Sequence, residues 1–296
     1  MKFSFFRSMK ITFFVSMVLI ILSLYHINRE GLDYGIEFMG GTEVVIKFED
    51  NVEIDQIRKS FTESGFSNIS IQEYGKDKEF LIRLPVNDEK EISKPNQYKD
   101  SLKEVVDNNF SSNSYSISRI DFIGPKVGKE LIQNGIYSII FGSLAILIYV
   151  FIRFSFSFAI AAVIALFHDF IITTTLITYL NVEITLATIA ALLTVIGYSV
   201  NDTIVIFDRV RENMKITKLP LSEIIDTSIF QTLSRTVLTV LTVLIVLVPL
   251  YFFGGVEIED FALIMIIGVT IGTYSSILFA PYIMYYLYRG KIEKNV

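Results

Sequence analysis

Six long apolar runs alternate with polar segments along the chain. They cover residues 11–27, 133–152, 157–180, 186–207, 235–253 and 261–287. Each run is near the ~20 residues that an α-helix needs to cross the ~30 Å hydrocarbon core of a bilayer. The pattern therefore predicts a polytopic α-helical membrane protein with six transmembrane helices. The first run is long for a signal peptide and no small-residue cleavage site follows it before Arg29, so we interpret it as a retained anchor.

A polar segment of about 100 residues separates the first two runs, which is long enough for a small folded domain. Residues 42–48, 69–73, 80–84 and 115–122 alternate as strands do. Residues 54–64 and 97–110 place apolar side chains at helical spacing. The order strand-helix-strand-strand-helix-strand is typical of an α+β ferredoxin-like domain. Its carboxylates are scattered without a histidine or nucleophile, which indicates a solvated face rather than a catalytic site.

These patterns divide the chain into three parts. Residues 1–27 form a cytoplasmic N-terminus and the first transmembrane helix, and residues 28–132 form an extracytoplasmic ferredoxin-like domain. Residues 133–296 form the other five transmembrane helices and a cytoplasmic C-terminus. The orientation follows from the short loops, because residues 181–185 and 254–260 contain no lysine or arginine. The basic loops then lie in the cytoplasm by the positive-inside rule, and so do both termini.

Composition narrows the function further. Hydrophobic residues make up 52% of the 296, which agrees with a membrane protein. The chain has no cysteine and only two histidines, so it offers neither a thiol nucleophile nor a multi-histidine metal site. The net charge is −5 and the cations are divided among loops, which argues against a nucleic-acid partner. We expect no metal and no cofactor.

One carboxylate, Asp202, follows Asn201 inside the fourth apolar run. An ionised side chain at bilayer depth costs roughly 2.5–3.5 kcal/mol even on lenient insertion scales. Asp202 therefore needs a partner, a proton or a water-filled path, and such a group usually moves ions or uses an ion gradient. The alternative is a buried hydrogen bond between helices, although a neutral Asn would serve that purpose at lower cost.

Three more ionisable residues are candidates for the same chemistry. Arg235 stands at the cytoplasmic entrance of the fifth run, where it either forms an ion pair with Asp202 or only anchors the helix end by snorkelling. His168 and Asp169 are adjacent near the middle of the third run. They form either a proton relay or an ordinary interhelical hydrogen bond. Gly268, Gly272, Ser275 and Ser276 indicate close helix packing, and the charges at residues 208–212 lie at the membrane edge and need no special role.

Several motifs in order along the chain resemble the SecF family, the smaller half of the SecD–SecF protein-export complex. Tyr-Ser-Val-Asn-Asp-Thr-Ile-Val-Ile-Phe-Asp-Arg-Val-Arg-Glu-Asn (198–213) is the longest, and Thr-Leu-Ser-Arg-Thr (232–236) and Ala-Leu-Phe-His-Asp (165–169) accompany it. The others are residues 31–42, 123–131, 253–255 and 272–276. Together with six spans and one outer domain, they cover nearly the whole chain and are highly specific.

The resemblance implies a subunit of the resistance-nodulation-division superfamily that uses the proton-motive force to draw a preprotein outward across the bacterial plasma membrane. The implied partners are SecD, the SecY translocon with SecE and SecG, YajC, and the translocating preprotein. It implies that Asp202 and Arg235 belong to a proton pathway, to which we add Asn201, His168 and Asp169. It implies no enzyme activity.

Two other functions remain open from the sequence. A proton-coupled small-molecule exporter of the same superfamily would normally be one long chain with two large outer domains. An intramembrane aspartyl protease using Asp169 and Asp202 would need two facing aspartates, and residues 197–202 lack the Gly-x-Gly-Asp spacing of that chemistry.

Overall fold

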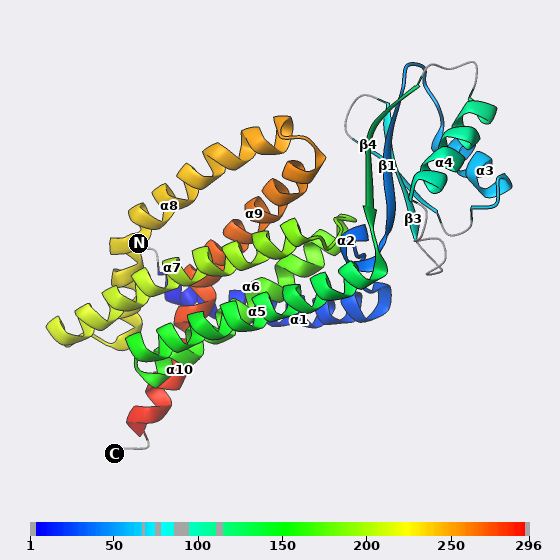
Figure 1. Ribbon diagram of the computed structural model, residues 1–296. Helices are drawn as coiled ribbons and strands as arrows, with labels where there is room; N and C mark the ends of the chain where they lie inside the picture. The colour runs from blue at the N-terminus through cyan, green and yellow to red at the C-terminus, as the bar shows by residue number, and fades with distance from the viewer. Residues whose placement is uncertain (1–3, 67–68, 75–77, 86–94, 111–114, 294–296) are drawn as a thin grey trace. The chain divides into compact units, whose positions relative to one another are not determined.

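The computed structural model describes residues 4–66, 69–74, 78–85, 95–110 and 115–293. The chain divides into two compact units. The helical unit contains Met1–Asp33 and Tyr137–Val296, and the sheet unit contains Tyr34–Ile136. Figure 1 shows the elements of both units.

Within the described residues, six helices are long and apolar enough to cross a membrane. The first three are α1 (Phe5–Glu30), α5 (Pro125–Arg153) and α6 (Phe156–Tyr179). The next two are α7 (Leu186–Ile216) and α8 (Leu221–Phe253). The last crossing combines α9 (Val256–Tyr274), a π-helical segment η2 (Ser275–Phe279) and α10 (Ala280–Glu293). The six predicted spans are therefore confirmed, although α5 and α8 begin earlier, and α7 ends later, than the apolar runs themselves.

The helices differ in how deeply they are buried. In α6, α7 and the last crossing, 56%, 50% and 44% of the most apolar stretch is buried, against 11% in α1, α5 and α8. Helices α6 and α7 and the last crossing therefore form the core of the helical unit, around Phe158, Phe207 and Phe279. The other three present apolar faces to their surroundings, as helices that are hydrophobic all round do in a membrane.

Local chemistry fixes the helix ends. The Thr185 hydroxyl accepts a hydrogen bond from the backbone N–H of Thr188, which caps the N-terminus of α7. The N-terminus of α1 is capped from another helix, because the Asp226 carboxylate of α8 accepts the N–H of Phe6 at 2.7 Å. The turn between α8 and α9 contains Gly255 at φ +77°, a conformation that glycine adopts without strain. In Figure 1, α8 and α9 run in opposite directions on either side of this turn.

The sheet unit has the predicted ferredoxin-like order. A short helix, α2 (Ile36–Met39), precedes strand β1 (Gly41–Phe48), helix α3 (Ile54–Glu63) and strands β2 (Ser70–Glu73) and β3 (Glu79–Pro85). Helix α4 (Pro95–Asn109) and strand β4 (Tyr115–Ile123) complete it. The strands form one antiparallel sheet in the order β2-β3-β1-β4, which leaves β2 and β4 at the edges.

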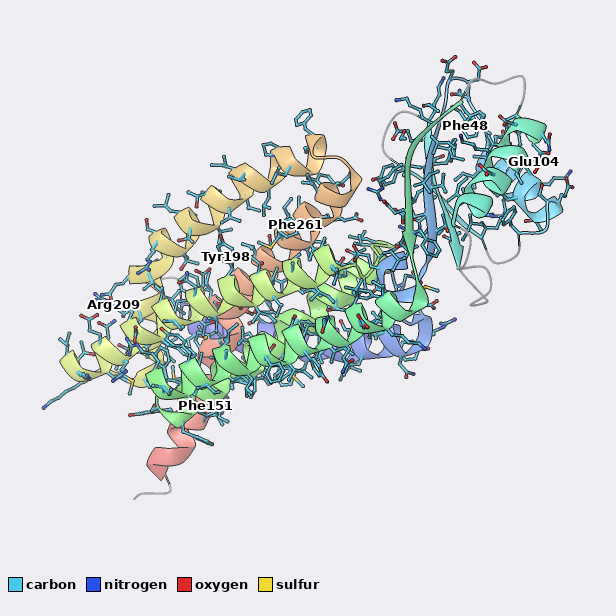
Figure 2. The ribbon with its side chains drawn as sticks, viewed as in Figure 1. Phe48, Glu104, Phe151, Tyr198, Arg209 and Phe261 are labelled. Carbon is cyan, nitrogen blue, oxygen red and sulfur yellow. The ribbon has the colours of Figure 1, made fainter. Side chains whose placement is uncertain are left out.

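The two faces of β1 carry different chemistry. Val44, Ile46 and Phe48 alternate onto the face that α3 and α4 cover, where they pack with Ile57 and Phe61. Figure 2 labels Phe48 in this core.

Glu43 lies on the other face of β1, buried between two arginines of the neighbouring strands. Its carboxylate accepts a hydrogen bond from Arg83 Nε at 2.9 Å and another from Arg119 Nη2 at 2.6 Å. Removing either the carboxylate or one of the arginines would leave a buried charge without its partner, which destabilises a protein strongly.

Candidate functional site

The five residues singled out by sequence fall into two groups within the helical unit. Asn201, Asp202 and Arg235 lie at or beside a cleft between α7 and α8. His168 and Asp169 lie in the interior, where α6 meets α7 and η2. No hydrogen bond or ion pair of the described residues joins the two groups directly.

The cleft has a volume of about 600 Å³ and a mainly polar lining. Its polar walls require water or a partner, because groups at membrane depth that find neither are costly. The α7 wall is formed by Asn201, Ile204, Val205, Asp208, Arg209 and Glu212, and the α8 wall by Gln231, Thr232 and Arg235.

Asp202 is 6% exposed, and the side chains of Arg235 and Asn201 are the neighbours that act electrostatically on its carboxylate. Within the described helices, no ion pair of 4.0 Å or less joins Asp202 to Arg235, whose side chain is exposed. The two charges therefore interact electrostatically without forming a direct ion pair.

Near the α7–α8 connection, a hydrogen-bonded network runs along the cleft wall. Arg209 donates from Nε to Gln231 Oε1 and from Nη1 to Glu212 Oε2, both at 2.6 Å. Asn213 Nδ2 donates to the same Gln231 oxygen at 2.8 Å. Figure 2 shows Arg209 at this end of α7. The bonds from Arg209 and Asn213 to Gln231 join α7 to α8.

The charges at 208–212 were expected to need no special role, but three of them, Asp208, Arg209 and Glu212, lie in the cleft wall. The signal that could have found them is their spacing, because positions 201, 204, 205, 208, 209 and 212 form one helical stripe. Asp208 also pairs with Arg153 of α5 at 2.6 Å.

The interior group centres on the Asp169 carboxylate, which is fully buried. His168 Nδ1 lies 2.8 Å from its Oδ1 atom. Ser275 of η2 donates to its Oδ2 atom at 2.7 Å, and Ser199 of α7 donates to the same atom. One carboxylate thus collects partners from three elements, which satisfies the demand of a buried charge for hydrogen bonds. Ser199 and Ser275 were not identified from the sequence as partners of Asp169.

Two glycines bring the helices close enough for these bonds. A Cβ atom at Gly268 would lie 2.3 Å from Val195 Cγ2, and one at Gly272 would lie 2.9 Å from Ser199 Cβ. The close packing expected of this small-residue stripe is therefore present between α7 and α9. The His168 ring stacks on Phe279 with the ring centroids 4.4 Å apart, which fixes its orientation.

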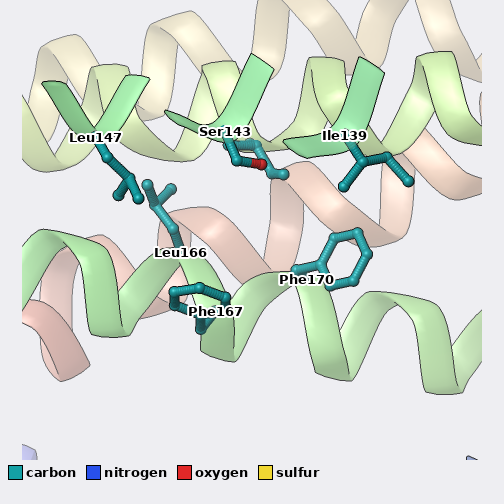
Figure 3. Close-up of a pocket in the computed structure, with 7 residues that line it drawn as sticks. Ile139, Ser143, Leu147, Leu166, Phe167 and Phe170 are labelled. Atoms are coloured by element: carbon teal, nitrogen blue, oxygen red, sulfur yellow. The ribbon is translucent and has the colours of Figure 1, made fainter. Parts of the chain in front are cut away.

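A second cavity, between α5, α6 and α7, has a different character. It measures about 90 Å³, and Figure 3 shows Ile139, Ser143 and Leu147 of α5 above Leu166 and Phe170 of α6. No ionisable residue lines it, so it offers no chemistry for ion transfer. Among the described residues, no group of three or more His, Asp or Glu side chains could hold a metal ion.

Comparisons with known proteins agree with this architecture. The family model of the protein export membrane protein SecD/SecF, C-terminal, matches residues 101–290. The protein translocase subunit SecF of Desulfurispirillum indicum is 40% identical over 286 residues, which are 95% of this chain and 90% of that protein. The SecF of Haemophilus influenzae is 38% identical over 301 residues, covering 99% of this chain and 90% of that one.

Two solved structures are similar as well. The crystal structure of SecDF from Thermus thermophilus, described as a translocon-associated membrane protein, matches with a TM-score of 0.85 and 35% identity over 97% of this chain. A SecDF structure in a super-membrane-facing form matches with a TM-score of 0.71 and 34% identity over 99% of this chain. This chain spans only 39% and 40% of those two longer chains.

These matches cover nearly the whole chain at identities well above the level that fold similarity alone would give. The two helices that carry the cleft and the three elements that carry the Asp169 cluster lie within the matched residues. The chain belongs to the SecF family of multi-pass membrane proteins, which are translocase subunits of the Sec protein-export pathway.

Proposed function

We propose that this SecF-family chain uses the proton-motive force across the bacterial plasma (inner) membrane to help draw a preprotein outward. The observation that carries the proposal is Asp202, a carboxylate in a membrane-spanning helix that lies beside a polar cleft and within electrostatic reach of Arg235. Asn201, the residue before Asp202, and Arg235 stand in the wall of the cleft. In this proposal the cleft brings water close to the Asp202 carboxylate.

The coupling step follows from the two charges. When Asp202 is ionised it attracts Arg235 across the gap between α7 and α8, and when it takes up a proton this attraction is lost. One charge moved across 100 mV is worth about 2.3 kcal/mol, which is enough to bias two helix packings that differ by that amount. The helices therefore change relative tilt each time a proton binds and leaves.

His168 and Asp169 provide a second place for a proton in the same unit. Their contact at 2.8 Å gives a proton two neighbouring heteroatoms to occupy. Because α7 carries both Ser199 and Asp202, three residues apart, the interior group and the cleft are coupled through one rigid helix. We assign both groups to the proton pathway.

Partners complete the site. The solved SecDF chains are more than twice as long as this chain, and we propose that a separate SecD chain supplies the remaining half and closes the cleft. The assembly then works beside the SecY translocon with SecE and SecG, and with YajC. Both termini lie in the cytoplasm in this arrangement, because the loops that contain no lysine or arginine then face outward.

The sheet unit is the part that meets the preprotein in this proposal. Its edge strands β2 and β4 leave backbone N–H and C=O groups for an extended chain to pair with. Backbone pairing tolerates many sequences, as an export subunit requires. Crosslinkers placed along β4 should capture a translocating chain, and a complete lack of capture would remove the sheet unit from this role.

The deciding experiment replaces Asp202 by Asn and measures preprotein export into inverted membrane vesicles with and without a proton gradient. We expect normal insertion and assembly, and loss of the gradient-dependent part of export only. Asp226→Asn is the matched control, because it makes the same chemical change on α8, at a residue that caps α1 rather than lining the cleft. Normal gradient-dependent export in the Asp202 variant at native expression would refute the proposal.

A further inference from the structure

The last transmembrane crossing is not a continuous α-helix. Between α9 and α10, residues Ser275–Phe279 form a π-helical segment, and the N–H of Ala280 bonds to the carbonyl of Ser275, five residues back. Such segments are rare and occur mostly as single turns, frequently at functional sites. Because each inserts one residue into the α-helical pattern, it needs specific contacts to hold it in place.

Two adjacent serines supply these contacts, and both are fully buried. Ser275 donates to Asp169 Oδ2 at 2.7 Å and lies 3.1 Å from the carbonyl of Gly272. Ser276 donates to the backbone carbonyl of Ser199 at 3.2 Å and shares a 2.7 Å hydrogen bond with Thr203. The widened turn thus presents neighbouring hydroxyls to two different helices. Only Ser275 reaches an ionisable group.

The charge of Asp169 decides whether the Ser275 bond can persist. An ionised carboxylate only accepts hydrogen bonds, and here Oδ2 accepts two hydroxyls while Oδ1 faces His168. Protonation turns one carboxylate oxygen into a donor. A proton on Oδ2 competes directly with Ser199 and Ser275, so at least one of the two hydroxyls must turn away.

The other titratable groups around this carboxylate are few. The titratable neighbour on α6 is His168. The one on α9 is Tyr274, whose ring lies 6.3 Å from the His168 ring. On α7 it is Asp202, nearly one helical turn beyond Ser199. From α1 the polar neighbour is Ser16, which is bonded to the Tyr274 hydroxyl at 3.0 Å. Within the described residues no Lys or Arg contacts Asp169, so its charge is balanced only by a proton, on the carboxylate itself or on His168.

We propose that Ser275 is a positioning residue that links the charge state of Asp169 to the backbone conformation of η2. With Asp169 ionised, Ser275 holds the π-helical segment. With Asp169 protonated, the segment relaxes to α-helix. This inference deepens the proposed function, because it rests on Asp169 taking up a proton during the transport cycle.

The consequence for α10 is set by helix geometry. Removing one inserted residue shifts the following helix by about 1.5 Å along its axis and rotates it by about 100°. Phe279 moves with it, and it stacks on both His168 and Phe13 of α1. Protonation of Asp169 would therefore shift α10 at the cytoplasmic end of the crossing and change how Phe279 packs against α1.

The chain has no native cysteine, so spin labels can be attached without background mutations. One label is placed at Leu287→Cys on the exposed side of α10 and the other at Lys215→Cys near the end of α7. The distance between them is measured by pulsed electron paramagnetic resonance on the full chain in lipid nanodiscs, from alkaline to acidic buffer. We expect two distance populations separated by several ångströms, with the ratio changing with pH.

Three variants separate the roles. Asp169→Asn, which cannot ionise, should hold one population at every pH, and Ser275→Ala should do the same because the link is broken. Ser276→Ala is the matched control, since its hydroxyl bonds to α7 and not to Asp169, and it should keep the wild-type response. Ser275→Thr, which restores a hydroxyl at the same position, should recover part of that response.

Two results would overturn the inference. One is a Ser275→Ala protein that keeps the full pH response, and the other is an Asp169→Asn protein that matches the wild type at every pH. The measurement uses no substrate, translocon or gradient, so failure here leaves the export result for Asp202 intact. Conversely, an Asp202→Asn protein that exports normally leaves this distance measurement intact.

Discussion

The contact between α7 and α9 allows a quantitative test, because a single methyl group at Gly268 cannot be accommodated. The new Cβ would lie 2.3 Å and 2.6 Å from the two methyl carbons of Val195. Ordinary carbon–carbon contacts are ~3.5–4.0 Å, so the overlap exceeds 1 Å and the helices must separate. Overpacking of this kind costs about 1–3 kcal/mol, and the preference of Ala over Gly in a helix returns at most about 1 kcal/mol.

The assay is a double-mutant cycle on the apparent free energy of unfolding, measured by titrating mixed micelles with sodium dodecyl sulfate. Gly268→Ala and Val195→Ala are made singly and together. Because Val195→Ala removes the two clashing methyl groups, we expect a favourable coupling of at least about 1 kcal/mol in the double variant. The control is Gly197→Ala on α7, the helix that carries Val195. A Cβ at Gly197 meets nothing within 4 Å, so the protein should be unchanged or slightly more stable.

The close approach of α7 and α9 would be refuted if the free-energy changes of the two single substitutions simply add in the double variant. If the cost of Gly268→Ala is the same with Val or Ala at 195, the two helices do not approach as closely as the structure indicates. The geometry that brings Ser199 to Asp169 would then lose its basis, since Gly272 on the same helix face makes the next close contact.

Three further outcomes are expected. Arg235→Lys should lose most of the gradient-driven export and Arg235→Ala all of it at unchanged protein levels, because a lysine lacks the planar fork of donors that can order water between the two side chains. Full activity with Lys would reduce Arg235 to a topology signal. Glu43→Gln should speed hydrogen exchange of the β1 amides about tenfold or more, because it removes the buried carboxylate that pairs with both Arg83 and Arg119. The half-exposed ion pair between Lys47 and Glu79 serves as the control, and Lys47→Gln should change the exchange of the β1 amides little. Asp226→Ala should lower the apparent free energy of unfolding by about 1 kcal/mol through loss of the α1 cap; an unchanged value would show that the cap contributes nothing.

The fold was largely predictable from periodicity. Apolar runs near 20 residues located all six crossings, and strict alternation located the strands, because one face of β1 is buried against helices. The lengths of the helices were harder to predict from the sequence. Hydropathy reports the depth of the membrane rather than the end of a helix, so it did not reveal that α7 continues through charged residues to Ile216 or that α8 begins at Leu221.

The candidate site was predictable only where it carried charge. Asp202 stood out because a carboxylate inside an apolar run is expensive, and His168 and Asp169 stood out for the same reason. Ser199 and Ser275 gave no comparable signal, since a serine hydroxyl in a transmembrane helix is readily satisfied by a backbone carbonyl. The π-helical segment left no trace in composition either, because its residues would suit an α-helix equally well.

The central claim is that a proton crosses this protein through Asp202, and proton flux tests it most directly. The chain is reconstituted with its SecD partner in liposomes that contain a pH-sensitive dye, and a proton gradient is imposed. The account predicts proton entry with the wild-type chain and entry at the level of empty liposomes with Asp202→Asn. Equal proton entry with Asp and Asn at position 202, or none with the wild type, would contradict it.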